Sequence, residues 1–281
     1  MLPLSMTSGR PLTSVISAPN RLLVSLLAEL VPFYRCGASI GFYLLSDLKR
    51  PNFPPAKVLI FLNAWRVDSA VRKVIREKLE RDGRTLIWMY GDGFIKDGKI
   101  SAVAASRLIG LRLQVRAPAA RFGSEIVAGN ALGLPIMHIT GLDASDIPTF
   151  AVGDPAAIPL ARYQDTGEVS IALRKYKDFQ SLFIGETRPP AAFWRALLPH
   201  LGAPVYLDND DAFETDGSLM MISGDAPGER TINLPVRSSV YDLMTGQKLA
   251  FNTHRCQALF GRYETKLLRI VPAGRKARAK H

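Results

Sequence analysis

The sequence predicts an α/β fold, a doubly wound and mostly parallel sheet of the flavodoxin-like type, followed by a small antiparallel β-domain. Three observations support this prediction. Strands and helices alternate up to about residue 203, two of the strands are apolar nearly throughout, and short strands separated by tight turns dominate afterwards. The predicted parts are an irregular segment, an α/β domain, a small β-sandwich-like domain and a basic disordered tail, at residues 1–19, 20–203, 204–273 and 274–281.

Helices are predicted where apolar residues recur at three- and four-residue spacing between capping residues. The segment 20–36 has this pattern, and Gly37 suits its C-terminal cap. Asp68 or Ser69 can cap a second helix, which Gly83 ends. Two further helices are predicted, at 101–109 and 189–198.

Strands are predicted at apolar runs that turn residues bound. Residues 57–62 and 85–90 look like strands buried on both faces of a parallel sheet, and their alternation with helices implies right-handed crossovers. The other strands predicted in the α/β domain are 40–45, an edge strand at 111–115, 150–152, 160–163, 169–173 and 181–184. Those predicted in the β-domain are 205–207, 219–222, 231–234, 239–241 and 267–271. The Gly- and Ala-rich stretch 116–147 gives no clear assignment.

The bulk composition excludes several classes of protein. No apolar run reaches the roughly 18 residues that cross a bilayer, and residues 1–20 lack the apolar core of a signal peptide, so we expect a cytoplasmic protein without membrane association. The net charge is +11, but the last eight residues carry four basic side chains and the rest is spread without a basic stripe. We therefore do not expect nucleic-acid binding.

Three successive strings resemble the trimerisation domain of bacterial β-galactosidases: FYLLSDL (42–48), KVLIFLNAW (57–65) and TLIWMYGDGFI (85–95). Two later strings continue in that family's order, PTFAVGD and LARY. Two strings after residue 205, GERTINLP and VYDLMTG, resemble the β-domain that commonly follows. The resemblance covers roughly residues 20–271. It implies a class I glutamine-amidotransferase-like fold, which that family uses for assembly and for walling the active site of a neighbouring subunit.

The chain departs from this family at its start. The resemblance implies a preceding catalytic (β/α)8 barrel, which takes about 250 residues. Only a short segment without the family's opening strand precedes residue 20. We therefore expect a module without the catalytic barrel: a separately encoded remnant, a split subunit or the product of a misplaced start.

The residues predict no catalytic set, no metal ligands and no cofactor. Cysteine enzymes of this fold carry the thiol on a sharp turn after a strand, and here that turn is Gly91-Asp92-Gly93. Cys36 and Cys256 lie elsewhere, the four histidines are scattered, and the acidic cluster 208–216 lacks the EF-hand spacing.

A small polar cleft is the candidate ligand site. Its residues follow two adjacent buried strands, where open α/β sheets bind ligands, and aromatic rings can stack on sugars. The alternative is that the aromatic residues only cover the end of the sheet. The candidate residues are Asn63, Trp65, Tyr90, Gly91 and Asp92.

Three functions remain open at this point. We favour a non-catalytic assembly or accessory module that forms a homo-oligomer, with a trimer as one option, or docks on a glycoside-hydrolase subunit and contributes to a carbohydrate site. The first alternative is a stand-alone carbohydrate-binding protein. The second is a glycoside hydrolase in which two loop carboxylates face each other about 5 to 10 Å apart, chosen from Asp47, Asp92 and Asp154.

Overall fold

The computed structural model describes residues 28–62, 64–117, 123–141 and 148–273. They form two compact units: the first contains Phe42–Phe193, and the second combines Leu30–Gly41 with the chain from Trp194 onward. The division falls within helix α5 (Ala191–His200), earlier than the boundary expected near residue 203. The predictions for 1–19 and 274–281 lie outside the described residues. None of the described helices has the length and apolar character needed to span a bilayer.

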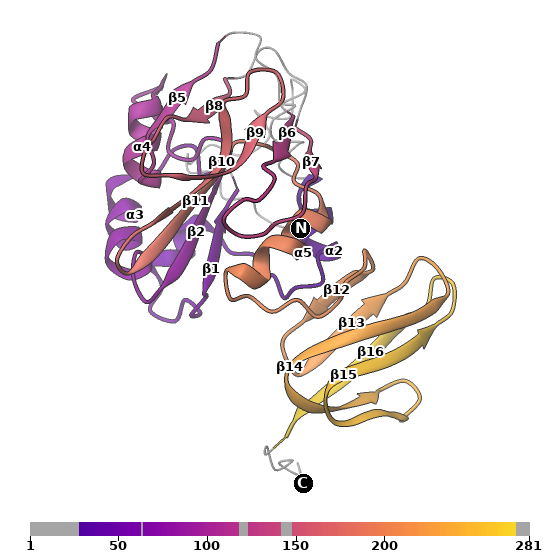
Figure 1. Ribbon diagram of the computed structural model, residues 1–281. Helices are drawn as coiled ribbons and strands as arrows, with labels where there is room; N and C mark the ends of the chain where they lie inside the picture. Colours follow the sequence, from indigo (N-terminus) through magenta and orange to yellow (C-terminus); the bar gives the residue numbers. More distant parts are fainter. Residues whose placement is uncertain (1–27, 63, 118–122, 142–147, 274–281) are drawn as a thin grey trace, which may run out of the picture. The chain divides into compact units, whose positions relative to one another are not determined.

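A seven-stranded mixed sheet forms the centre of the first unit (Figure 1), in the order β1-β2-β11-β10-β9-β6-β7. Strands β1 and β2 are parallel, and so are β2 and β11, whereas the remaining neighbours pair antiparallel. The strands are β1 (Val58–Phe61), β2 (Arg84–Met89), β6 (Ser124–Ile126), β7 (His138–Ile139), β9 (Ile158–Tyr163), β10 (Val169–Lys175) and β11 (Phe179–Ile184).

The prediction of a mostly parallel sheet is wrong. Only residues 164–168 join β9 to β10, and only 176–178 join β10 to β11. A parallel pair needs a crossover of about a dozen residues or more, so connections this short can only make antiparallel hairpins. The predicted α/β alternation therefore holds only for the first strands of the unit.

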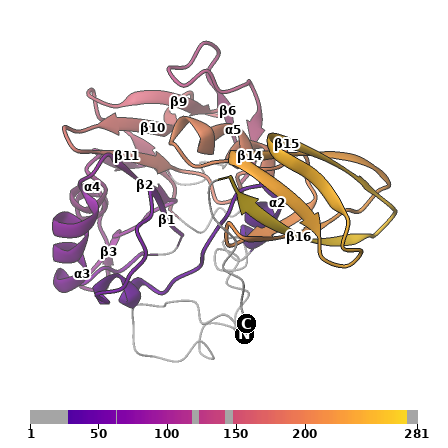
Figure 2. The ribbon, with the colours of Figure 1, turned by 90° about the horizontal axis from the view of Figure 1, so that it is seen from below.

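Two helices pack on this sheet (Figure 2). Helix α3 (Ser69–Val74) continues into a π-helical turn, Ile75–Leu79, and α4 (Ala102–Ile109) follows β2 in the chain. As predicted, the Asp68 carboxylate caps α3 by accepting a 2.7 Å hydrogen bond from the Val71 amide. Residues of both helices join strands β1 and β2 in one apolar core. A doubly wound fold requires helices on both faces of the sheet, and that arrangement is not confirmed.

Smaller elements complete the first unit. The expected strand at 40–45 is wrong, because the chain enters a 3-10 turn at Leu45–Lys49 without a preceding strand. The edge strand β5 (Leu113–Val115) pairs antiparallel with β8 (Phe150–Val152), apart from the main sheet. A short hairpin, β3 (Ile95–Lys96) and β4 (Lys99–Ile100), leads into α4.

The second unit contains the predicted antiparallel β-domain. Its five strands lie in the order β12-β13-β16-β14-β15 and form one sheet, so the expected second layer of a sandwich is not present among the described residues. The predicted strands 231–234 and 239–241 belong to one long strand, while Val205 makes only an isolated bridge to Ala38. Helix α2 (Leu30–Arg35) is the described part of the predicted helix 20–36. The strands are β12 (Ala212–Thr215), β13 (Leu219–Ser223), β14 (Gly228–Asp242), β15 (Lys248–Phe260) and β16 (Thr265–Pro272).

Candidate functional site

The carboxyl ends of β1 and β2 bring most of the predicted cleft residues to one edge of the sheet. The two strands pair in parallel register, with Phe61 opposite Trp88, so the segments that follow them start side by side. The Gly93 amide donates a 2.7 Å hydrogen bond to the Ala64 carbonyl, and the Ile95 amide donates one of 2.9 Å to the Trp65 carbonyl. We call this place the crest. Asn63 lies outside the described residues.

Tyr90 is fully buried at the crest. Its ring packs edge-on against Phe94 and Phe150, at centroid distances of 5.9 and 5.7 Å. Its hydroxyl donates a 2.6 Å hydrogen bond to the Pro148 carbonyl, and burial raises the pKa of this phenol above its ordinary value. In this conformation the ring offers no free surface to a sugar.

Gly91 is required by close packing. A Cβ atom at this position would lie 2.7 Å from Cε2 of Phe150, which is well inside van der Waals contact. The backbone therefore lies directly against the aromatic cluster, and only glycine fits without displacing it.

Asp92 is fully buried as well. Its Oδ2 accepts a 3.2 Å hydrogen bond from the Met89 amide, whereas Oδ1 accepts no hydrogen bond of ordinary geometry from a described residue. Burial raises the pKa of the carboxyl well above its usual range, and the backbone groups of Ala64 and Met89 offset this only in part. A carboxyl without solvent access, whose ionisation burial opposes, stabilises a turn more readily than it attacks a substrate.

Trp65 is the member of the crest with an accessible surface, since its side chain is only half-buried. The ring centroid lies 6.3 Å from that of Phe94. The indole Nε1 is buried and donates no hydrogen bond to a described residue. Because this N–H has no access to solvent, only the exposed part of the ring can contact a ligand or partner.

The other two loop carboxylates serve their own loops. Asp47 accepts a 2.9 Å hydrogen bond from the Leu44 amide and forms an ion pair with Arg50 at 3.1 Å. Asp154 accepts hydrogen bonds from two backbone amides and forms a 2.6 Å ion pair with Arg174. No hydrogen bond links Asp47, Asp92 and Asp154 to one another in the described part of the chain.

A second buried acid, Glu186, was not predicted from the sequence. It follows β11, whose Ile184 carbonyl accepts a 2.7 Å hydrogen bond from the Tyr90 amide at the crest. Its Oε1 accepts hydrogen bonds from the Gly123 amide, at 2.9 Å, and from the Ser124 hydroxyl, while Oε2 has no partner among the described residues. Burial raises the pKa of this carboxyl to about 7, against the lowering effect of those two donors. An acid two residues after the predicted strand 181–184 was the signal that could have revealed it.

The two cysteines and the acidic cluster, which the sequence analysis did not treat as sites, lie in the following environments. Cys36 and Cys256 are buried thiols whose pKa burial raises. In the acidic cluster, Asp211 pairs with Arg230, and Asp216 accepts hydrogen bonds from the turn before β13. The described residues hold no group of three or more side chains suited to a metal ion.

No protein-family model matches the sequence, and no curated protein matches it. Solved structures do match. The β-galactosidase from Bacillus circulans sp. alkalophilus superposes with a TM-score of 0.62 at 15% identity, over 92% of this chain and 38% of that chain. The enzyme from Rahnella sp. R3 gives a TM-score of 0.60 at 15% identity, over 91% of this chain and 38% of that chain. The enzyme from Halorubrum lacusprofundi gives a TM-score of 0.58 at 12% identity, over 92% of this chain and 37% of that chain.

The chain therefore has the fold of part of a β-galactosidase, and a further match is described as a GH42 enzyme. The resemblance inferred from the sequence is confirmed at the level of the fold. The chain spans 38% of the length of the Bacillus enzyme that it matches.

Proposed function

We propose that this chain is a non-catalytic assembly or accessory module related to glycoside hydrolases. It would form a homo-oligomer, with a trimer as one option, or dock on a glycoside-hydrolase subunit. The observation that carries the proposal is that nearly the whole chain shares its fold with only a part of several β-galactosidases. Its cytoplasmic location is proposed from the sequence alone.

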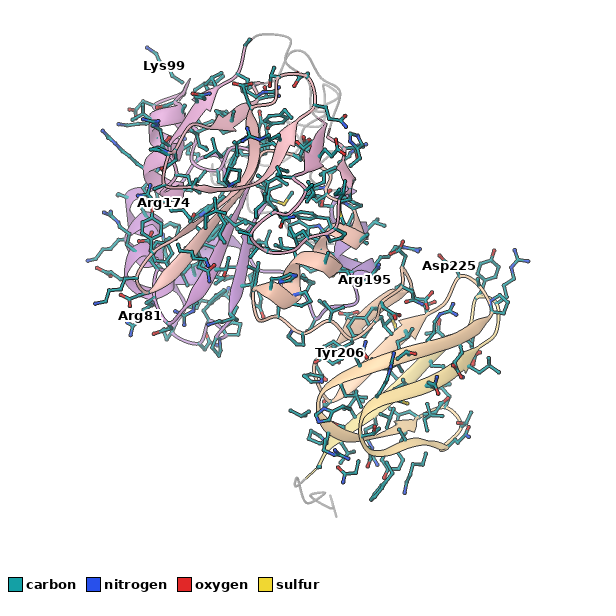
Figure 3. All side chains as sticks on the ribbon, in the orientation of Figure 1. Arg81, Lys99, Arg174, Arg195, Tyr206 and Asp225 are labelled. Atoms are coloured by element: carbon teal, nitrogen blue, oxygen red, sulfur yellow. The ribbon has the colours of Figure 1, made fainter. Side chains whose placement is uncertain are left out.

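An exposed apolar pair on the first unit supports self-association. Ile100, at the end of β4, is 55% exposed, and Val103, in the first turn of α4, is 61% exposed. Figure 3 shows the neighbouring Lys99 projecting away from the first unit. Burying such side chains against a partner is favourable at about 25 cal/mol per Å² of apolar surface. This surface, Ile100 with Val103, is the candidate contact.

Trp65 supports a contribution to a carbohydrate site. Its side chain is half-buried, so part of the indole ring is accessible, and an aromatic ring can stack on a sugar. Tyr90 and Asp92 would then hold the crest in place behind Trp65, rather than touch the ligand themselves. The same observation favours the second candidate function, a stand-alone carbohydrate-binding protein.

Light scattering on the purified full chain tests the assembly. We expect a mass that is a multiple of 30.9 kDa at about 10 µM protein, a concentration at which micromolar association is populated. Val103→Asp should shift the mass to that of the monomer, because a charge would be buried in the contact. Val236→Asp, at a 53% exposed position of the second unit, is the matched control. A monomer at this concentration would contradict self-association and would leave docking on a glycoside-hydrolase subunit as the remaining form of the proposal.

Calorimetry separates the two candidates. The stand-alone binding protein is favoured if a monomeric protein releases or absorbs heat on mixing with galactosides and Trp65→Ala abolishes that heat. Stable oligomers that give no heat with galactosides favour the assembly module.

A further inference from the structure

Three side chains from neighbouring strands form a row across the second unit's sheet. Tyr241 of β14 lies opposite Lys248 of β15 on one side and opposite Arg269 of β16 on the other. Lys248 Nζ is 5.7 Å, and Arg269 Cζ is 5.1 Å, from the centroid of the Tyr241 ring. Lys248 Nζ also lies 5.2 Å from the ring of Phe251. We call these four residues the cation row; Figure 1 shows β16, β14 and β15 in this order.

The row lies on the outer face of the sheet. The residues that alternate with Tyr241 and Arg269, namely Val240, Leu268 and Ile270, are buried in the unit's core. Side chains alternate between the two faces of a strand, so Tyr241 and Arg269 must point away from that core. Lys248 and Arg269 are exposed, and 72% of Phe251 is accessible.

The two cations have no carboxylate partner among the described residues, whereas two other cations of the same unit have one. Lys266 pairs with Glu264 at 2.6 Å, and Arg230 pairs with Asp211. Lys248 and Arg269 are held only by the aromatic rings, which attract a cation without neutralising it. The face therefore carries two positive charges that no described carboxylate pairs with.

We propose that the cation row binds a polysaccharide that carries carboxylates, such as a polyuronate. Strands lie about 4.8 Å apart, so the strands that carry Lys248 and Arg269 are about 10 Å apart, and a polymer with repeated carboxylates can contact both at once. Arg269 offers a planar fork for a carboxylate, and the exposed ring of Phe251 offers an apolar surface for a pyranose.

The same geometry disfavours nucleic acid as the ligand. Single strands bind by stacking bases on open aromatic faces along a basic groove. In the row, Lys248 and Arg269 approach Tyr241 from the strands on either side, so Phe251 is the one ring of the row left open, whereas successive bases need a series of open rings. The choice of a glycan rests on the proposed relation to glycoside hydrolases, whereas the row itself does not depend on self-association.

Fluorescence anisotropy of a labelled oligogalacturonate, titrated with the full chain at low salt, tests the proposal. We expect Lys248→Gln/Arg269→Gln to weaken binding about tenfold, since each exposed charge contact contributes a few-fold in affinity. Arg262→Gln/Lys175→Gln removes the same net charge from two other exposed cations, of which Arg262 also lies 5.0 Å from a tyrosine ring. This control should change the affinity less than about twofold.

Three outcomes would overturn the proposal. The first is an equal loss in both double variants, which would indicate diffuse attraction by the net charge. The second is no binding, or equal binding of a neutral galactan oligosaccharide of the same length. The third is binding of an oligo-dT of equal charge at least as tight as that of the uronate, which would assign the row to nucleic acid. Light scattering on the same samples reports separately whether the assembly proposal holds.

Discussion

The crest of the first unit and the cation row of the second unit use ionisable side chains in opposite ways. Asp92 at the crest and Glu186 after the neighbouring β11 are fully buried, and each keeps one carboxylate oxygen without a described partner. In the row, Lys248 and Arg269 are exposed. Burial makes a carboxylate costly to ionise, whereas exposure leaves a cation accessible to a ligand. The difference teaches that unpaired polar atoms can mark either a closed structural centre or an open binding face, depending on access.

The largest expected effect tests how closely the chain is packed where β11 ends, next to the crest. Gly185 precedes Glu186, and a Cβ there would lie 2.2 Å from the Tyr163 hydroxyl and 2.9 Å from the Ser170 carbonyl oxygen. Gly185→Ala should lower the free energy of unfolding of the first unit by about 3 kcal/mol, as measured by chemical denaturation. Gly261→Ala is the control, because its Cβ would approach only the Glu264 side chain, at 3.4 Å. Equal losses in both variants would contradict tight packing at the end of β11.

The next effect concerns the ionisation of Glu186. Burial raises the pKa of its carboxyl from 4.5 to about 7, so the folded protein holds this proton more tightly than the unfolded chain does. The stability from the protonated acid is complete below pH 4.5 and is lost as the pH rises to about 7. We expect this loss to be about 2 kcal/mol, somewhat below the full conversion of the pKa difference.

Denaturation at several pH values, with wild type and Glu186→Gln, measures this loss. The variant should flatten the decrease between pH 5 and 8, because its side chain cannot ionise. Glu125→Gln on the exposed face of β6 is the control. If wild type and Glu186→Gln showed the same pH dependence, the buried acid would not be its source.

The smallest stability effect compares one tyrosine from each region. Tyr90→Phe removes the hydrogen bond to the Pro148 carbonyl at a buried site and should cost about 1 kcal/mol. Tyr241→Phe removes a hydroxyl at the half-buried row and should change the free energy of unfolding by less than about 0.5 kcal/mol. A larger cost at Tyr241 than at Tyr90 would reverse the comparison.

Local signals predicted the elements near the crest well. Strands β1 and β2 are apolar nearly throughout, and Asp68 and Ser101 cap α3 and α4 as side chains of their kind should. Strand direction depends on the connections instead, and the short segments 164–168 and 176–178 already contained the information that β9, β10 and β11 are antiparallel. Strand β15 was missed because polar residues interrupt its apolar pattern. Its pairing with β14 also contains register shifts, which a local sequence pattern does not show.

The location of the candidate site was predictable, but its burial was not. Strand ends placed Trp65 and Tyr90 at one edge of the sheet. The residues that enclose Tyr90, Pro148 and Phe150, are distant in sequence, so no local pattern could show that the ring is covered. The cation row was missed for the same reason, since Tyr241 and Arg269 become neighbours only when the sheet forms.

The central claim is that this chain supports other parts of an assembly and breaks no glycosidic bond itself. Incubation of the purified full chain with a chromogenic β-galactoside tests it most directly. The account predicts no release of the chromophore above the buffer rate, and no difference between wild type and Asp92→Asn. Release that persists through purification and disappears in a folded Asp92→Asn variant would contradict it.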